Sequence, residues 1–89
     1  MDTPPKEGLV FPCDYGIKVI GRDVEGFEAF VRETLESHLP AVDRGEISAR
    51  PSRQGAYLCV SVRFLARSRE QMDALSSELG ADPRVKYVF

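Results

Sequence analysis

One stretch sets the orientation of the whole chain, AYLCVSVRFL at residues 56–65. Apolar side chains occupy every second position in it, and this period of two is typical of a β-strand with one buried face. The side chains expected to face a core are Leu58, Val60, Val62 and Phe64. Those expected on the opposite, open face are Tyr57, Cys59, Ser61 and Arg63. The stretch therefore predicts a long, half-buried strand.

Strand and helix patterns alternate on both sides of this stretch. Strands are predicted over residues 15–21, 46–50, 56–65 and 84–89, and helices over residues 23–38 and 68–79. This βαββαβ order predicts a ferredoxin-like α+β fold, in which a four-stranded antiparallel sheet of order 4-1-3-2 carries both helices on one face. Residues 9–89 are expected to form this single domain, and the polar, proline-rich residues 1–8 a flexible tail.

Residues that begin and end helices delimit the two helical patterns. Asp23 is expected to cap the first helix and Pro40 to end it. Ser68 and Gln71 have the spacing of a capping box at the start of the second helix, and Gly80 is expected to stop it in a left-handed conformation. Each helix has only one apolar face, so the helices can cover only one side of the sheet.

The same alternation assigns the other strands and predicts a basic open face. Residues expected to point inward are Ile17, Val19, Ile47, Ala49, Val85, Tyr87 and Phe89. The open face is then expected to carry Lys18, Arg50, Arg63, Arg84 and Lys86 against the carboxylate of Glu46, with Ile20, Ser48 and Val88 between them. The helices carry mostly carboxylates, so the net charge of −2 hides a separation of charge between the two sides. Such a face can attract an anion, although scattered charges on a solvated surface are the plain alternative.

Composition and spacing exclude several classes of protein. Two cysteines without a CxxC pair and a single histidine make a disulfide framework, a zinc site or a soft-metal site unexpected, and no cofactor is predicted. Residues 21–27 resemble the phosphate-binding loop of acylphosphatases, but the chain contains no asparagine to orient an attacking water. His38 ends the first helix, where a histidine usually bonds a carbonyl or interacts with the helix dipole. No catalytic constellation emerges, so a non-enzymatic protein is predicted.

Two further features concern location and nucleic acid. The N-terminal residues do not have a signal-peptide pattern and no apolar run approaches about 18 residues, so a cytoplasmic protein without a membrane span is expected. Recognition of single-stranded RNA by this fold needs stacking aromatic side chains on the first and third strands. Tyr57 supplies one, but Lys18 occupies the other position, so nucleic acid is the second interpretation of the basic face.

Several short segments point to a family when they are taken together. They are residues 9–12, 15–21 and 51–57, Leu75 with Glu78 and Leu79, and a terminal strand containing Val85. In this order they resemble the YbeD-like family of small bacterial proteins. The resemblance covers residues 9–89. It implies a ferredoxin-like fold similar to that of ACT domains, a cytosolic setting and no established reaction, since the family is classed as a domain of unknown function.

These observations predict an ACT-like regulatory or adaptor module that binds an anionic small molecule or a protein partner on its open face. Lys18, Tyr57, Arg63 and Lys86 are expected to neighbour one another across the first, third and fourth strands and to form the site. The cations would bind carboxylate or phosphate, and Tyr57 would supply contact area. A homodimer through the edge strand 84–89 or through the open face is the other expected partnership.

Overall fold

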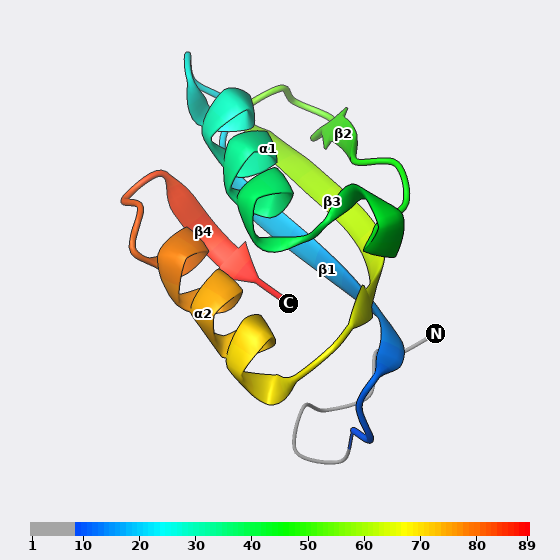
Figure 1. Ribbon diagram of the computed structural model, residues 1–89. Coiled ribbons are helices and arrows are strands. Elements are labelled where there is room, and N and C mark those ends of the chain that lie inside the picture. The colour runs from blue at the N-terminus through cyan, green and yellow to red at the C-terminus, as the bar shows by residue number, and fades with distance from the viewer. Residues whose placement is uncertain (1–8) are drawn as a thin grey trace.

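The computed structural model describes residues 9–89, and the predicted tail at residues 1–8 lies outside them (Figure 1). The elements follow in the order β1 (Cys13–Arg22), α1 (Phe27–His38), a 3-10 turn η2 (Ala41–Asp43), β2 (Ser48–Pro51), β3 (Tyr57–Ala66), α2 (Arg69–Gly80) and β4 (Val85–Val88). The βαββαβ order predicted from the sequence is confirmed, and so is the ferredoxin-like fold class.

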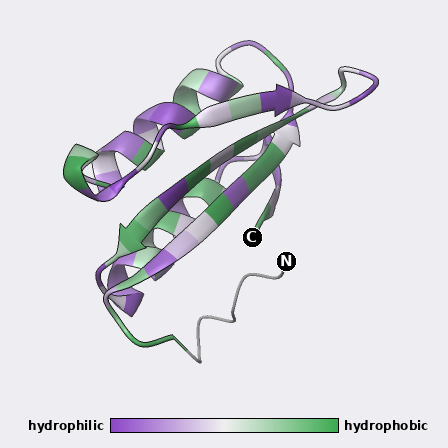
Figure 2. Ribbon diagram, turned by 90° about the vertical axis from the view of Figure 1, so that its right-hand side faces the viewer, coloured by the Kyte–Doolittle hydropathy of each residue, from purple (hydrophilic) through white to green (hydrophobic). Residues whose placement is uncertain are grey.

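The sheet is antiparallel and has the strand order β2-β3-β1-β4, which is the predicted 4-1-3-2 order in reverse. β1 and β3 form its centre and pair along their whole length, from Cys13 opposite Ala66 to Arg22 opposite Tyr57. Both helices lie on one face of the sheet (Figure 1). The two long strands change between hydrophobic and hydrophilic residues along their length (Figure 2), as strands with one covered and one open face must.

The core lies between the sheet and the two helices. The predicted inward residues of β3 are buried, as are Ile17 and Val19 of β1. The helices contribute side chains with no exposed surface, namely Phe27, Val31 and Leu35 from α1 and Leu75 and Leu79 from α2. The three- to four-residue spacing of these side chains explains why each segment is helical, because it places them on one face.

The helix ends differ in part from the prediction. α1 begins at Phe27, after Gly26 in the left-handed region (φ 86°), and no side chain caps it, so the prediction of Asp23 as the cap was wrong. Asp23 instead follows the last residue of β1 and donates its backbone N–H to Ala56 O at 3.0 Å. In α2, Ser68 Oγ accepts the N–H of Gln71 at 3.1 Å, as predicted. Gly80 is the last helical residue and is followed by Ala81 in a right-handed conformation, so the left-handed stop was wrong.

β4 contradicts the predicted alternation because its pairing with β1 is irregular. Val88 lies opposite Val19, Tyr87 opposite Ile20, and Val85 opposite Gly21, with a β-bulge between Ile20 and Gly21. The extra residue shifts the facing of the strand by one. Val85 and Val88 therefore pack on the core. Tyr87 and Phe89, predicted inward, are 61% and 57% exposed, so their facing and that of Val88 were wrong.

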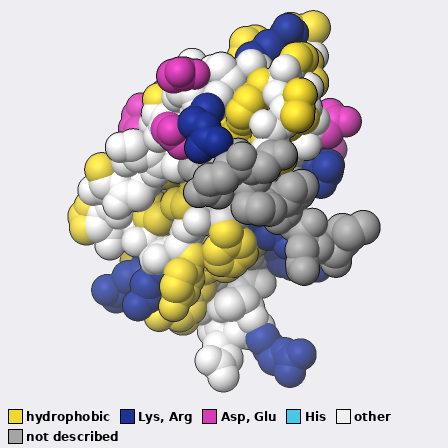
Figure 3. Space-filling model, turned by 90° about the horizontal axis from the view of Figure 1, so that it is seen from below, with side chains coloured by type: hydrophobic (Ala, Val, Ile, Leu, Met, Phe, Trp, Pro, Cys, Tyr) yellow, Lys and Arg dark blue, Asp and Glu magenta, His cyan; other side chains and the backbone are white. Residues whose placement is uncertain are grey.

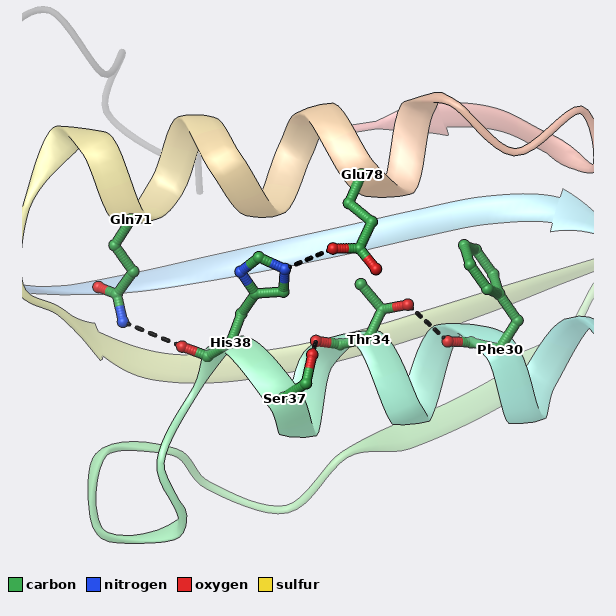
Figure 4. Close-up of polar contacts among 6 residues, drawn as sticks. All are labelled: Phe30, Thr34, Ser37, His38, Gln71 and Glu78. Carbon is green, nitrogen blue, oxygen red and sulfur yellow. Dashed lines mark hydrogen bonds and ion pairs between the residues drawn. The ribbon is translucent and has the colours of Figure 1, made fainter.

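The two helices are joined by polar contacts along their seam (Figure 4). His38 Nε2 lies 2.7 Å from Glu78 Oε1, and Gln71 Nε2 donates to the carbonyl oxygen of His38 at 3.3 Å. The imidazole of His38 thus contacts a carboxylate of the other helix, whereas the sequence predicted a carbonyl or the helix dipole. Thr34, buried beside it, donates its hydroxyl to Phe30 O at 2.8 Å. The contacts of His38 with Glu78 and Gln71 fix the position of α1 relative to α2.

Two arginine–carboxylate pairs fix the turns of the domain. Arg67 donates from Nε and Nη2 to the two carboxylate oxygens of Asp43, and its guanidinium lowers the pKa of that carboxyl group. Arg84 binds Asp82 in the same two-pronged way and also donates its backbone N–H, at 2.8–2.9 Å. These bonds lower the pKa of Asp82 to about 2. The guanidinium of Arg84 also lies 5.3 Å from the ring centre of Phe30 on α1.

The pair of Asp82 and Arg84 predicts a defined dependence of stability on acid. A carboxyl group whose pKa is lowered from 3.8 to about 2 in the folded state stabilises the fold above the higher value, and this stabilisation is lost as the pH falls through the lower one. We expect Asp82→Asn to lower the melting temperature by a constant amount above about pH 4, and this difference to shrink between about pH 4 and pH 2. Thermal melts across that range measure it.

The partner variant Arg84→Gln is the matched control for this prediction. It removes the guanidinium and leaves the carboxyl group, so its melting temperature should also converge toward that of the parent protein in acid. A difference for Asp82→Asn that stays constant down to pH 2 would contradict the assignment of the lowered pKa.

Candidate functional site

The open face of the sheet is lined by alternate residues of the four strands. The register places Lys18 opposite Ser61, Ile20 opposite Cys59, and Arg22 opposite Tyr57 on β1 and β3. β2 adds two polar side chains, since Ser48 lies opposite Ser61 with their hydroxyl oxygens 3.1 Å apart, and Arg50 lies opposite Cys59. Arg63 lies opposite Gly16 and its guanidinium runs over that residue. The face is therefore a polar surface with scattered apolar side chains.

The structure brings together only part of the predicted group of Lys18, Tyr57, Arg63 and Lys86. Lys86 Nζ lies 5.8 Å from the ring centre of Tyr57, a cation–π contact that spans β1, the strand between β3 and β4. Arg63 lies on the same strand as Tyr57 but about 20 Å away, since each residue of a strand adds about 3.3 Å. Lys18 lies between these two ends, opposite Ser61. Tyr57 and Lys86 therefore form one local site, to which Arg63 does not belong.

An open hollow of about 390 Å³ lies at this end of the sheet. The residues that line it are Ile20 of β1, Ser52 and Tyr57 at the ends of the β2–β3 hairpin, and Lys86 and Tyr87 of β4. The hairpin fixes its rim, because Ser52 N–H donates to Tyr57 O at 2.7 Å and Ser52 Oγ accepts the N–H of Tyr57 at 3.1 Å. Gly55, with φ 78°, supplies the left-handed turn residue of that hairpin.

Sequence reasoning missed the aromatic part of this hollow. Tyr87 was assigned to the core, and Ile20 was placed on the open face without a role. The bulge in β4 turns Tyr87 outward opposite Ile20. Its ring lies 6.4 Å from that of Phe89, which also faces outward. A signal existed in Gly21, because a glycine inside a strand pattern often marks a bulge or a close approach of backbone.

Charge on the open face differs from the prediction at Arg84, Arg22 and Asp14. Arg84 precedes β4 and turns to Asp82 and Phe30, so it does not belong to this face. Arg22, which the prediction left out, lies opposite Tyr57 and is exposed. A carboxylate, Asp14, lies opposite Leu65 at the far end of the face. Seen from below the view of Figure 1, the surface carries hydrophobic side chains beside side chains of both charges (Figure 3).

The described residues offer neither a metal centre nor a disulfide. Within residues 9–89, no group of three or more His, Cys, Asp or Glu side chains is placed to hold a metal ion. Cys13 and Cys59 are both free thiols. Across the same residues, none of the helices has the length and apolar character needed to cross a membrane. The chemistry at the hollow is that of a cation, a hydroxyl group and aromatic rings.

The chain has a ferredoxin-like fold that is similar to the fold of ACT domains. The ACT domain from the GTP pyrophosphokinase of Chlorobium tepidum superposes with a TM-score of 0.70 at 14% identity, over 85% of this chain and 94% of that domain. The solution structure of protein HP0495 from H. pylori gives a TM-score of 0.68 at 12% identity, over 100% of this chain and 98% of that protein. These likenesses concern the fold alone.

The sequence itself shows the family. The chain belongs to the family described as protein of unknown function (DUF493), which matches residues 6–89. A UPF0250 protein of Ectopseudomonas mendocina is 43% identical over 87 residues, covering 97% of this chain and 92% of the relative. One of Ralstonia nicotianae is 40% identical over 88 residues, covering 98% and 91%. The resemblance to the YbeD-like family is therefore confirmed.

Proposed function

We propose that this protein is a non-enzymatic regulatory or adaptor module that binds an anionic small molecule or an anionic protein surface on its open sheet face. The observation that carries the proposal is the ammonium group of Lys86 held over the ring of Tyr57 beside an open hollow. A cation beside an apolar surface is a recurrent way to bind a carboxylate or phosphate. The apolar surface lowers the local dielectric constant, and this strengthens the attraction between the cation and the anion.

The wider distribution of charge supports an anionic partner. Four further cations lie on the same face, namely Lys18, Arg22, Arg50 and Arg63. The two helices on the other side carry six carboxylates against the two cations Arg32 and Arg69. A surface with an excess of cations raises the local concentration of anionic ligands and speeds their association. The sequence resemblance implies an ACT-like fold and no established reaction. Both agree with a role in binding.

Charge reversal on the open face tests the proposal. Lys18 and Lys86 are exposed, so the double variant Lys18→Glu, Lys86→Glu should keep the fold and lose the anionic ligand. A panel of anionic metabolites is screened by melting temperature, since a ligand that binds only the folded state stabilises it, by about 2.7 kcal/mol at a hundredfold excess over its dissociation constant. We expect at least one compound to stabilise the parent protein and none to stabilise the double variant.

A matched control changes the charge by the same amount elsewhere. Arg32→Glu with Arg69→Glu alters the two helices and should still respond to the compound that stabilises the parent protein. Equal stabilisation of the parent protein and the open-face double variant would contradict the proposal. Light scattering at several concentrations, run with and without that compound, would show whether the partner is a second copy of the chain.

Nucleic-acid binding is the second candidate, and one observation favours it. Tyr57, Tyr87 and Phe89 all face outward, so the open face offers more aromatic surface for stacked bases than the sequence predicted. Binding dominated by phosphates weakens steeply as salt rises, with a slope set by the number of phosphates neutralised. A single-stranded oligonucleotide titrated at several salt concentrations separates this candidate from the first.

A further inference from the structure

We infer that the hollow beside Lys86 takes a small molecule in which a flat aromatic or heteroaromatic ring carries one anionic group, a carboxylate or a phosphate. The inference rests on the proposed function and narrows it to one class of ligand. It follows from the size of the hollow, from the nature of its walls and from the number of charges on its rim.

Size favours a small ligand. Sites for small molecules usually have volumes of roughly 300–1,000 Å³. The hollow, at about 390 Å³, lies at the lower end of that range. It can hold a ring system with a short acidic substituent, whereas a stretch of polymer would have to extend over the rest of the sheet.

The walls favour a flat, apolar ring. Ile20 forms the middle of the hollow, with Tyr57 on β3 at one side and Tyr87 on β4 at the other. Tyr87 is 61% exposed, so its ring is available for contact with a ligand. Tyrosine side chains lose little conformational entropy when they bind, and pairs of aromatic rings gain more free energy than the buried area alone would give.

The charges favour one anionic group. Lys86 is the charged residue among the described side chains that line the hollow, and it forms no ion pair within residues 9–89. Ser52 Oγ already accepts the N–H of Tyr57, so its hydroxyl hydrogen can donate to a ligand. One ammonium group and one hydroxyl group suit a single carboxylate or phosphate at the rim. No described carboxylate side chain lines the hollow to repel it.

The bulge in β4 makes this arrangement possible. In a regular strand, two consecutive side chains point to opposite faces. At the irregularity between Ile20 and Gly21, both Lys86 and Tyr87 reach the open face and line the same hollow. The cation and the ring are therefore adjacent in the sequence and adjacent in the site.

The test is a titration followed by NMR, with indole-3-acetate as the probe. Indole-3-acetamide keeps the ring and removes the charge, and acetate keeps the charge and removes the ring. We expect saturable shifts at the lining residues with the acid, and an affinity lower by roughly tenfold or more for each comparison compound. Indole-3-acetamide loses a hydrogen bond between charged groups, and acetate loses the contact between aromatic rings. Two of the three tyrosines of the chain line the hollow, so their ring signals should shift while that of Tyr15 should not.

Three single variants separate the parts of the site. Lys86→Met should remove the preference for the acid over the amide and leave the ring contact. Tyr87→Ala should weaken the binding of the acid and of the amide by a similar factor. Lys18→Met removes the same charge from the same face outside the hollow, so it should change the dissociation constant by no more than about twofold. The dispersion of each amide spectrum checks that every variant is folded.

The outcomes decide between the inference and the function on which it rests. Equal affinity for the acid and the amide, or shifts spread evenly over Lys18, Arg50 and Arg63, would overturn the inference. The proposed function would survive that result if another anion bound the parent protein and not the charge-reversed double variant. Stronger binding of a single-stranded oligonucleotide, with a steep salt dependence, would overturn the inference in favour of nucleic acid. No response to any anion would reject both.

Discussion

Replacing Phe27 with alanine is expected to lower the free energy of unfolding by about 3–5 kcal/mol, the usual loss for a fully buried phenylalanine. Phe27 has no exposed surface, and it is the first residue of α1, where it anchors the helix to the sheet. Small domains have a total free energy of unfolding of about 5–15 kcal/mol, so this variant would lose a large part of its stability. Urea denaturation followed by circular dichroism measures the change.

Phe89→Ala is the matched control for that experiment. Phe89 is 57% exposed on the open face, so removal of its ring should change the free energy of unfolding by less than about 1 kcal/mol. A loss of less than about 1 kcal/mol for Phe27→Ala would mean that the ring does not fill the core as described.

Gly21→Ala is expected to be the second most damaging change, with a loss at or above the upper end of the usual 1–3 kcal/mol for overpacking. A Cβ atom at Gly21 would lie 2.4 Å from Cζ of Phe27 and 2.5 Å from the backbone oxygen of Arg84. The phenylalanine ring is fully buried, and the backbone of Arg84 is held by its hydrogen bond with Arg22. Neither neighbour can move without disturbing the sheet.

Gly80→Ala provides the control for the same chemical change. Gly80 ends α2, and no heavy atom of the described residues lies within 4 Å of a Cβ added there. Alanine favours the helix over glycine, so this variant should be more stable by about 0.5–1 kcal/mol. Combining Gly21→Ala with Phe27→Leu should recover part of the loss, because the shorter side chain vacates the position of the ring. Strict additivity of the two changes would argue against the clash.

Most of the fold could be predicted because its determinants are periodic. The alternation in β3 and the three- to four-residue spacing in α1 and α2 each depend on one segment of the chain. The start of α1 was missed for the opposite reason. Asp23 is a good capping residue in isolation, but its backbone is taken up by pairing with Ala56, a contact distant in the sequence. Gly26, in a left-handed conformation, then precedes Phe27, the first residue of the helix.

The candidate site could be predicted only in part. Tyr57 and Lys86 were identified because alternation placed both on the open face, and the structure brings the ammonium group of Lys86 over the ring of Tyr57. Tyr87 was lost because alternation counts residues in twos, and a single extra residue in β4 reverses the count. Arg63 was wrongly grouped with them, since a list of open-face residues does not say how far apart they lie along the strand.

The irregularity of β4 also separates what the strand does for the fold from what it offers to a ligand. Val85 and Val88 pack on the core, while the two residues between them, Lys86 and Tyr87, both reach the hollow. These two exposed positions are flanked on both sides by residues that pack on the core. An exchange of these two residues would therefore change the surface of the hollow and leave the packing beneath the sheet unaltered.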